Sequence, residues 1–232
     1  MRLALIGDIH GNSAALRVVL DHAASENVDM LLVTGDLVGY YFDPRGVLDL
    51  LAPWQKYIVR GNHEDMLASA RRDPGELPRT QLRYGSGLRI ALETLSAEEL
   101  DALSALPHPL DLNLDGMHIL LCHGAPWDND CYVYPDAGAG LTLRCAIPGY
   151  NLVVLGHTHY PMMRKTEETI IINPGSVGQP RNRKPGAQWA LIDTQSGDMD
   201  LRSESYDYAS VAAEARMRHP EMPYLAEVLE RE

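Results

Sequence analysis

The sequence lacks the features of a nucleic-acid-binding, disulfide-rich or membrane-spanning protein. Its 32 acidic residues outnumber its 20 lysines and arginines, and the net charge of −12 argues against a basic face for nucleic acid. Its three cysteines match neither a zinc pattern nor a disulfide framework. No apolar stretch is as long as a membrane span, and the apolar run of the first residues is too short for a signal peptide. We therefore predict a cytoplasmic protein without a nucleic-acid or membrane partner.

The composition is that of a folded globular protein. Hydrophobic residues make up 45% of the 232 residues and charged residues 22%. A chain of this length can bury a core without disulfides or a structural metal, so any metal ligands are free to serve chemistry. Because no repeat, low-complexity tract or linker interrupts the chain, we expect one domain over residues 1–232.

The first half of the chain alternates apolar runs of strand length with helical stretches. The predicted strands are residues 3–6, 30–33 and 56–59, and the predicted helices are residues 13–25, 44–51 and 64–71. This alternation favours βαβ units and a largely parallel sheet. Residues 79–106 are also expected to be helical, with a capping box formed by Ser96 and Glu99.

The second half contains mostly short strands joined by polar turns. Hairpin turns are expected at residues 167–168 and 196–197. Residues 208–232 are expected to be helical, with Asp207 as a cap. The predicted strands are residues 110–114, 117–122, 152–155, 162–166, 169–173, 189–193 and 198–203.

Polar residues of a few types follow five of the predicted strands. Because sites in open α/β sheets lie at the carboxyl ends of the strands, these residues are expected to converge at one edge. Mixed imidazole and carboxylate ligands suit Mn, Fe, Ni, Co or Zn better than Ca. The residues are Asp8 and His10, then Asp36, then Asn62, His63 and Glu64, then His123, and finally His157 and His159.

The order and spacing of these motifs resemble the signature of calcineurin-like metallophosphoesterases. The motifs are Asp8-x-His10, Gly35-Asp36, Gly61-Asn62-His63-Glu64, His123-Gly124 and Gly156-His157-x-His159, and the resemblance runs from residue 1 to about residue 182. It implies an α/β fold, a four-layer α/β/β/α sandwich of two mixed β-sheets flanked by helices. It also implies a hydrolase that acts on phosphoric esters.

The resemblance implies a cofactor of two divalent transition-metal ions, with Mn, Fe, Ni and Zn as candidates. One ion would be held by Asp8, His10, Asp36 and His159, and the other by Asp36, Asn62, His123 and His157. Asp36 would bridge the ions, and a bridging water or hydroxide would attack phosphorus in line. His63 would act as general acid or bind a phosphate oxygen.

Gly39 and Tyr40 distinguish the chain from two well-known branches of this superfamily. Protein phosphatases and dinucleoside-polyphosphate hydrolases carry Asp and Arg there, in GDxVDRG, whereas this chain reads GDLVGY. The segments GDLVGYYFDP, HGAPWDNDCYVYP and NPGSVGQPR resemble small prokaryotic phosphodiesterases instead. A phosphodiesterase acting on a small or nucleotide-like diester is therefore expected. A phosphomonoesterase or protein phosphatase, and a non-catalytic metal-binding interaction module, remain alternatives.

Four residues are candidates for substrate binding. Ser176 and Arg181 lie in a Gly-Ser turn that either binds phosphate or only closes a hairpin. Tyr134, close after His123, either lines a pocket with Tyr132 or packs within its loop. Asn12 is more easily explained as a helix cap than as a substrate ligand.

The remaining histidines are not expected to bind metal, and Glu64 is not expected to be catalytic. Glu64 is interpreted as a first-turn acid that favours its helix. The C-terminal segment either covers the sheet or contributes to a homo-oligomer, and a small phosphorylated substrate is the expected partner. His22, His108, His118 and His219 are expected to be at the surface or half-buried.

Overall fold

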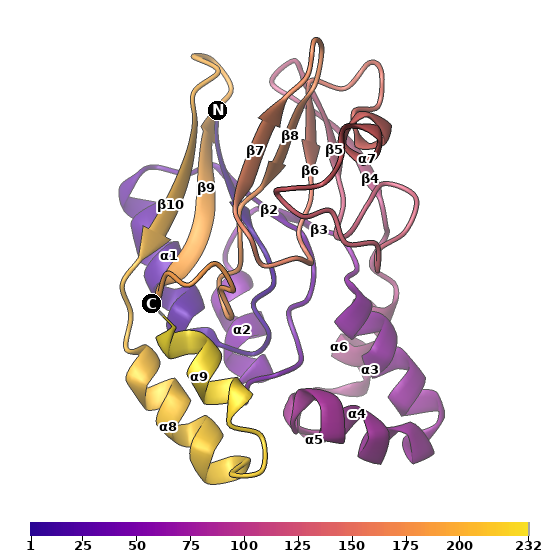
Figure 1. The fold of residues 1–232 in the computed structure, drawn as a ribbon, viewed down its shortest axis with the longest axis vertical. Helices are drawn as coiled ribbons and strands as arrows, with labels where there is room; N and C mark the ends of the chain where they lie inside the picture. Colours follow the sequence, from indigo (N-terminus) through magenta and orange to yellow (C-terminus); the bar gives the residue numbers. More distant parts are fainter. Residues whose placement is uncertain (232) are drawn as a thin grey trace.

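The computed structural model describes residues 1–231, and within them ten strands form two five-stranded sheets (Figure 1). The first sheet has the order β10-β9-β1-β2-β3, in which β1 pairs in parallel with β2 and antiparallel with β9. Leu3 thus lies between Met30 and Ile192. The strands are β1 (Arg2–Ile6), β2 (Met30–Val33), β3 (Lys56–Ile58), β9 (Ala187–Asp193) and β10 (Met199–Glu204).

The second sheet has the order β4-β5-β6-β8-β7. Its three central strands run parallel, and each edge strand pairs antiparallel with its neighbour. The hairpin turns predicted at residues 167–168 and 196–197 join β7 to β8 and β9 to β10. The strands are β4 (Leu110–Leu114), β5 (Met117–Leu121), β6 (Leu152–Val154), β7 (Met162–Lys165) and β8 (Ile170–Asn173).

The two sheets pack face to face and carry helices on their outer faces, which confirms the predicted four-layer sandwich. The alternation of side chains along a strand produces this arrangement. In β1, Leu3 and Leu5 pack against the second sheet, whereas Ala4 and Ile6 pack against the helices. Burial of apolar residues on both faces explains why β1 reads as a continuous apolar run.

Helices surround the sheets and extend below them in Figure 1. Helix α1 packs on β9, and α7 shares an apolar core with the outer face of the second sheet. Helices α3–α6 and the pair α8–α9 stand on opposite sides of the loops that follow the strands (Figure 1). The helices are α1 (Ser13–Ser25), α2 (Pro44–Leu51), α3 (Asn62–Arg72), α4 (Leu77–Tyr84), α5 (Gly87–Thr94), α6 (Ala97–Ser104), α7 (Ala139–Cys145), α8 (Tyr208–Arg218) and α9 (Tyr224–Glu230).

Two predictions about helices need correction, and one helix lies where none was predicted. Residues 79–106 form parts of three short helices, broken at Gly85, whose φ of 77° ends α4, and at the Ser96 cap of α6. The predicted helix over residues 208–232 is two helices, because Pro220 follows the C-cap residue His219 of α8 and cannot continue the helix. Glu232 lies outside the described residues. Helix α7 was not predicted at all.

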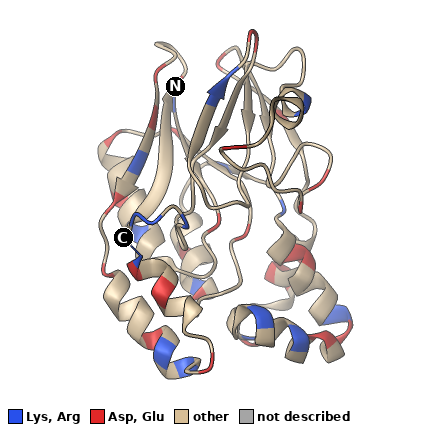
Figure 2. Cartoon of the chain, in the orientation of Figure 1, with Lys and Arg blue, Asp and Glu red and all other residues tan. Residues whose placement is uncertain are grey.

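Charged residues of both signs are mixed along the ribbon in the view of Figure 2. Figure 2 shows lysine and arginine interspersed with aspartate and glutamate over the ribbon. None of the helices among residues 1–231 is long and apolar enough to cross a membrane. The expected lack of a nucleic-acid footprint stays a prediction, supported by the net charge of −12.

Candidate metal centre

The motif residues meet at the carboxyl ends of β1, β2, β3, β5 and β6. Their side chains form three clusters, in each of which the candidate ligand atoms lie within 4.8 Å of one another. Asn62 joins them, because its Oδ1 lies 2.9 Å from His123 Nε2. All members except Asn62 are buried. The clusters are Asp8 with His10 and His159, His10 with Asp36 and His63, and Asp36 with His123 and His157.

Asp36 stands between the two predicted ion positions. Its Oδ2 lies 3.7 Å from His10 Nε2 and 3.4 Å from His123 Nε2. Its other oxygen, Oδ1, accepts a hydrogen bond of 2.9 Å from the backbone N–H of His63. One carboxylate oxygen is therefore held by the protein, while the other faces both imidazoles.

Three histidines are oriented by backbone carbonyls. His10 Nδ1 donates to the carbonyl of Val38. In the same way, His123 Nδ1 donates to the carbonyl of Thr34 and His159 Nδ1 to that of Gln179, each at 2.7 Å. An imidazole that donates through Nδ1 carries its lone pair on Nε2. This arrangement is the usual support of metal-binding histidines, because it fixes both the tautomer and the ring direction.

This arrangement leaves nitrogen lone pairs that a cation would satisfy. His10 Nε2 and His159 Nε2 lie 3.0 Å apart, although both are acceptors in the tautomer that the carbonyls impose. His157 Nε2 is buried and has no hydrogen-bond partner in the described part of the chain. Facing lone pairs repel one another and are satisfied by a shared ion, so the donor set fits transition metals.

Five of the predicted ligands have left-handed backbone conformations. Such positive φ angles are uncommon for residues other than glycine and cost on the order of 1–3 kcal/mol each. Strain of this kind persists only where the surrounding structure enforces it, and it concentrates at functional sites. The residues are Asp8 (φ 50°), His10 (54°), Asp36 (53°), His157 (66°) and His159 (61°).

Glu64 supports the centre in a way that the sequence interpretation missed. It is a first-turn acid of α3 as predicted, and its carboxylate accepts a hydrogen bond of 2.9 Å from the N–H of the N-cap residue Gly61. Its buried carboxylate also accepts hydrogen bonds from the N–H groups of Asp36 and Leu37, at 2.9 and 2.8 Å. One side chain therefore fixes the loop after β2 to the loop after β3. The signal available in the sequence was only its place beside His63.

The ionisable groups of the centre are strongly perturbed. Burial raises the pKa of Asp8 to about 7, and the nearby charge of Asp36 adds to this effect. Burial lowers the pKa of His63 to about 4, so its imidazole is neutral at pH 7. Burial alone would also lower the pKa of His123, but Asp36 outweighs it and raises the value to about 9. Such shifts are typical of functional sites.

Two of the predicted substrate ligands have structural roles instead. Asn12 caps α1 by accepting from Ala15 N–H, and its amide donates to the Gly178 carbonyl and the Tyr206 hydroxyl. Ser176 is fully buried, and its hydroxyl donates to the carbonyl of Asp8 at 2.7 Å. The hydrogen bonds of these side chains are used within the fold, and their contact with a substrate stays a prediction.

The other two candidates are Arg181 and Tyr134. Arg181 contacts Tyr40, which packs on His10 of the centre, whereas Tyr134 reaches the centre only through Tyr132. The Arg181 guanidinium donates to the Tyr40 hydroxyl and to Gln179 Oε1, and its Nε is buried without an acceptor among residues 1–231. Tyr134 stacks on Tyr132 with ring centroids 5.6 Å apart. It is Tyr132 whose ring contacts His157, at 3.9 Å between centroids.

Gly39 and Tyr40 replace a carboxylate–arginine pair with aromatic packing. A Cβ atom at Gly39 would lie 2.0 Å from His63 Nδ1, and Gly39 has a φ of +105°. The ring of Tyr40 packs at 4.6 Å from that of His10 and at 4.9 Å from that of His63. In this chain His63 is thus oriented by packing and by its backbone.

The comparisons with known proteins agree with this geometry. The model of the calcineurin-like phosphoesterase superfamily domain matches residues 1–197. The uncharacterized protein MJ0912 of Methanocaldococcus jannaschii is 26% identical over an alignment of 230 residues that covers 88% of each chain.

Two solved structures are similar over nearly their whole length. A metallophosphoesterase from Sphaerobacter thermophilus has a TM-score of 0.79 and 27% identity, covering 100% of this chain and 98% of that one. Hypothetical protein PH1004 from Pyrococcus horikoshii OT3 has a TM-score of 0.84 at 22% identity, covering 98% and 97%, and shows the shared fold. Since the family model spans most of the chain, this protein belongs to the calcineurin-like phosphoesterase superfamily.

Proposed function

We propose that this phosphoesterase is a binuclear-metal phosphodiesterase that hydrolyses a small or nucleotide-like phosphodiester. The observation that carries the proposal is the position of Asp36, whose Oδ2 faces His10 on one side and His123 on the other. A single carboxylate oxygen between two sets of imidazoles is the arrangement that a bridged pair of ions requires.

The residues present fit two ions of Mn, Fe, Ni or Zn. Asp8, His10, Asp36 and His159 would hold one, and Asp36, Asn62, His123 and His157 the other. When bound, such ions polarise a phosphate ester and lower the pKa of water towards about 7, which supplies a nucleophile at neutral pH.

The protein's own residues would bind and orient the ester. The buried Nε of Arg181 lacks an acceptor in the described residues, so a phosphate oxygen would satisfy it. Arg181 thereby brings a guanidinium to the centre from the loop after β8. It contacts Tyr40, and position 40 is where related phosphatases carry an arginine. His63, neutral at pH 7, would donate one N–H to a phosphate or leaving-group oxygen.

The diester preference rests on Gly39 and Tyr40. In this chain position 39 offers no carboxylate to His63, and a Cβ at Gly39 would collide with its ring. The centre therefore lacks the Asp–Arg pair of the monoester-cleaving protein phosphatases.

The test is elemental analysis of the purified protein together with assays on p-nitrophenyl phosphate and bis-p-nitrophenyl phosphate with added Mn. We expect about two metal ions per chain and faster cleavage of the diester. Asp36→Asn should lose metal and reduce the rate by at least about a thousandfold, because both ions share this residue. Asp136→Asn, which alters an exposed loop carboxylate, is the matched control.

Each contrary result favours a different alternative. Better cleavage of the monoester would support a phosphomonoesterase. Two bound ions without turnover of either ester would support a metal-binding interaction module.

A further inference from the structure

A cavity of about 390 Å³ opens beside the metal centre. Its lining includes Asn62 of the proposed second ion site, and Tyr84, Arg83 and Tyr132 form much of the remaining wall. Cavities of this size hold small molecules. A second cavity of about 200 Å³ shares Met66, Arg83 and Tyr84 with the first, and the hollow thus continues along α4.

The two tyrosines come from distant parts of the chain. Tyr84 is the last residue of α4, whereas Tyr132 lies in the loop after β5. Tyr84 packs edge-on against His63, with ring centroids 5.2 Å apart, and Tyr132 packs on His157 at 3.9 Å. Each tyrosine ring therefore lines the cavity on one side and contacts a histidine of the centre on the other.

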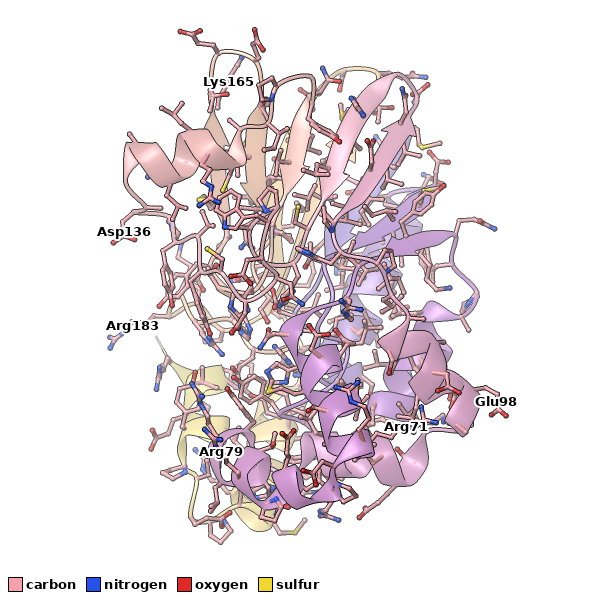
Figure 3. The ribbon with its side chains drawn as sticks, turned by 90° about the vertical axis from the view of Figure 1, so that its right-hand side faces the viewer. Arg71, Arg79, Glu98, Asp136, Lys165 and Arg183 are labelled. Carbon is pink, nitrogen blue, oxygen red and sulfur yellow. The ribbon has the colours of Figure 1, made fainter. Side chains whose placement is uncertain are left out.

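Arg83 adds a cation to the same wall. Its guanidinium lies 5.1 Å from the centre of the Tyr84 ring, within cation–π range. Arg83 forms no hydrogen bond or ion pair in the part of the chain that the structure describes, so its donors are available to a ligand. Arg79, labelled in Figure 3, lies on the same helix, α4, and lines the smaller cavity.

From this juxtaposition we infer that Tyr84, Arg83 and Tyr132 form a subsite for an aromatic leaving group, of which a nucleoside is the biological representative. The inference rests on the proposed phosphodiesterase function. The subsite takes the leaving group because Tyr84 contacts His63, the residue proposed to donate to the leaving-group oxygen. A flat ring would stack on a tyrosine, and its polar edge would reach Arg83.

The chemistry of the wall favours an aromatic group over an aliphatic one. Tyrosine rings present flat apolar faces, and stacking tolerates any base because every base has a π-face. Asp130 also lines the cavity and lies close to His157, with Oδ1 3.5 Å from Nε2, so a second phosphate would meet a negative charge there. The subsite therefore suits a neutral nucleoside better than a nucleotide carrying a further phosphate.

The experiment compares kcat/KM for thymidylyl-thymidine, whose leaving group is a nucleoside, with kcat/KM for glycerophosphocholine, whose leaving groups are aliphatic. In Tyr84→Ala the ratio of the two values should fall about tenfold to a hundredfold, mainly through the KM of the dinucleotide. Tyr84→Phe keeps the ring and should retain most of the ratio. Leu82→Ala, on an exposed residue of the same helix, is the matched control.

Losses that are equal for both substrates would overturn the subsite, because they would show that Tyr84 acts only through His63. Metal content by elemental analysis distinguishes a damaged centre from a lost subsite. If the wild type cleaves neither diester, the proposed function fails, and binding still decides the subsite. Metal-loaded wild type should then bind thymidine 5′-monophosphate more tightly than inorganic phosphate by calorimetry, and Tyr84→Ala should lose that advantage. Equal affinities in the wild type would refute the inference.

Discussion

At the scale of single residues, Glu64 links the loops that carry the proposed ligands. Its carboxylate is fully buried and accepts N–H groups from Gly61, Asp36 and Leu37. Burial raises its pKa to about 7, and the nearby charge of Asp36 raises it further, whereas the amide donors oppose both effects. Replacing one carboxylate oxygen of Glu64 by an amide nitrogen would place N–H donors opposite backbone N–H groups, which are also donors.

Glu64→Gln should therefore destabilise the fold, although the two side chains have nearly the same shape. We expect the free energy of unfolding to fall by about 1–3 kcal/mol, the cost of leaving buried donors unsatisfied. Denaturant titration measures this change. The control is Glu98→Gln, on an exposed first-turn acid of α6, which should unfold like the wild type. Identical midpoints for wild type and Glu64→Gln would mean that the loops do not depend on this carboxylate.

The sequence predicts which residues meet at the centre better than it predicts what supports them. Asp8, Asp36 and His123 are recognisable because they follow apolar strands whose ends converge. The supporting contacts depend on three-dimensional packing, as when Ser176 binds the carbonyl of Asp8 across 168 positions. No local pattern encodes such a contact, so the sequence alone leaves open whether Ser176 binds phosphate or only closes a turn.

At the scale of elements, the pair α8–α9 covers the loop that follows β2. Leu225 and Val228 of α9 share an apolar core with Tyr40 and Tyr41, and the Tyr41 hydroxyl donates to the Leu225 carbonyl at 3.0 Å. The pair is also joined to the opposite helices through His219. This histidine was predicted to be at the surface or half-buried, but it is buried, with 3% of its surface exposed.

His219→Ala should loosen α8–α9. His219 Nε2 accepts from the Ser86 backbone N–H at 3.1 Å and lies 2.8 Å from the Ser86 hydroxyl, so its removal leaves buried donors unpaired. We expect a loss of about 1–3 kcal/mol and faster hydrogen exchange in α8–α9. His22→Ala, on an exposed histidine of α1, is the control. Unchanged exchange in α8 would show that the contact does not hold the helices.

Helix boundaries followed the sequence where a side-chain cap marked them. Ser96 and Glu99 form the predicted capping box, and Asp207 caps α8. The end of α4 was missed because Gly85 reads as tolerable within a helix, although a Cβ there would lie 2.8 Å from Leu225 Cδ1. That neighbour is 140 residues away, so only the folded structure reveals the restriction.

At the scale of the whole molecule, both sheets contribute ligands to each proposed ion. Asp8 and His10 follow a strand of the first sheet and meet His159 from the second. Asp36 of the first sheet likewise meets His123 and His157 of the second. Bound ions would therefore join the two halves of the sandwich.

Removal of metal by a chelator should lower the melting temperature. An ion present at about 100 times its Kd stabilises the native state by about 2.7 kcal/mol, which corresponds to roughly 5–10 °C for a chain of this size. Scanning calorimetry with stripped protein and added Mn measures the shift, and Asp36→Asn should respond far less. If stripped protein melts at the same temperature with and without Mn, bound ions do not join the two sheets.

The distribution of ligands between the sheets also has a kinetic consequence. The ligands of the first ion span residues 8–159, so they come together only through contacts of high sequence separation, which form slowly. A chain emerging from synthesis has Asp8 and His10 long before His159. Until the second sheet docks, neither proposed ion would have its full set of ligands, so metal uptake would mark the completion of folding rather than its beginning.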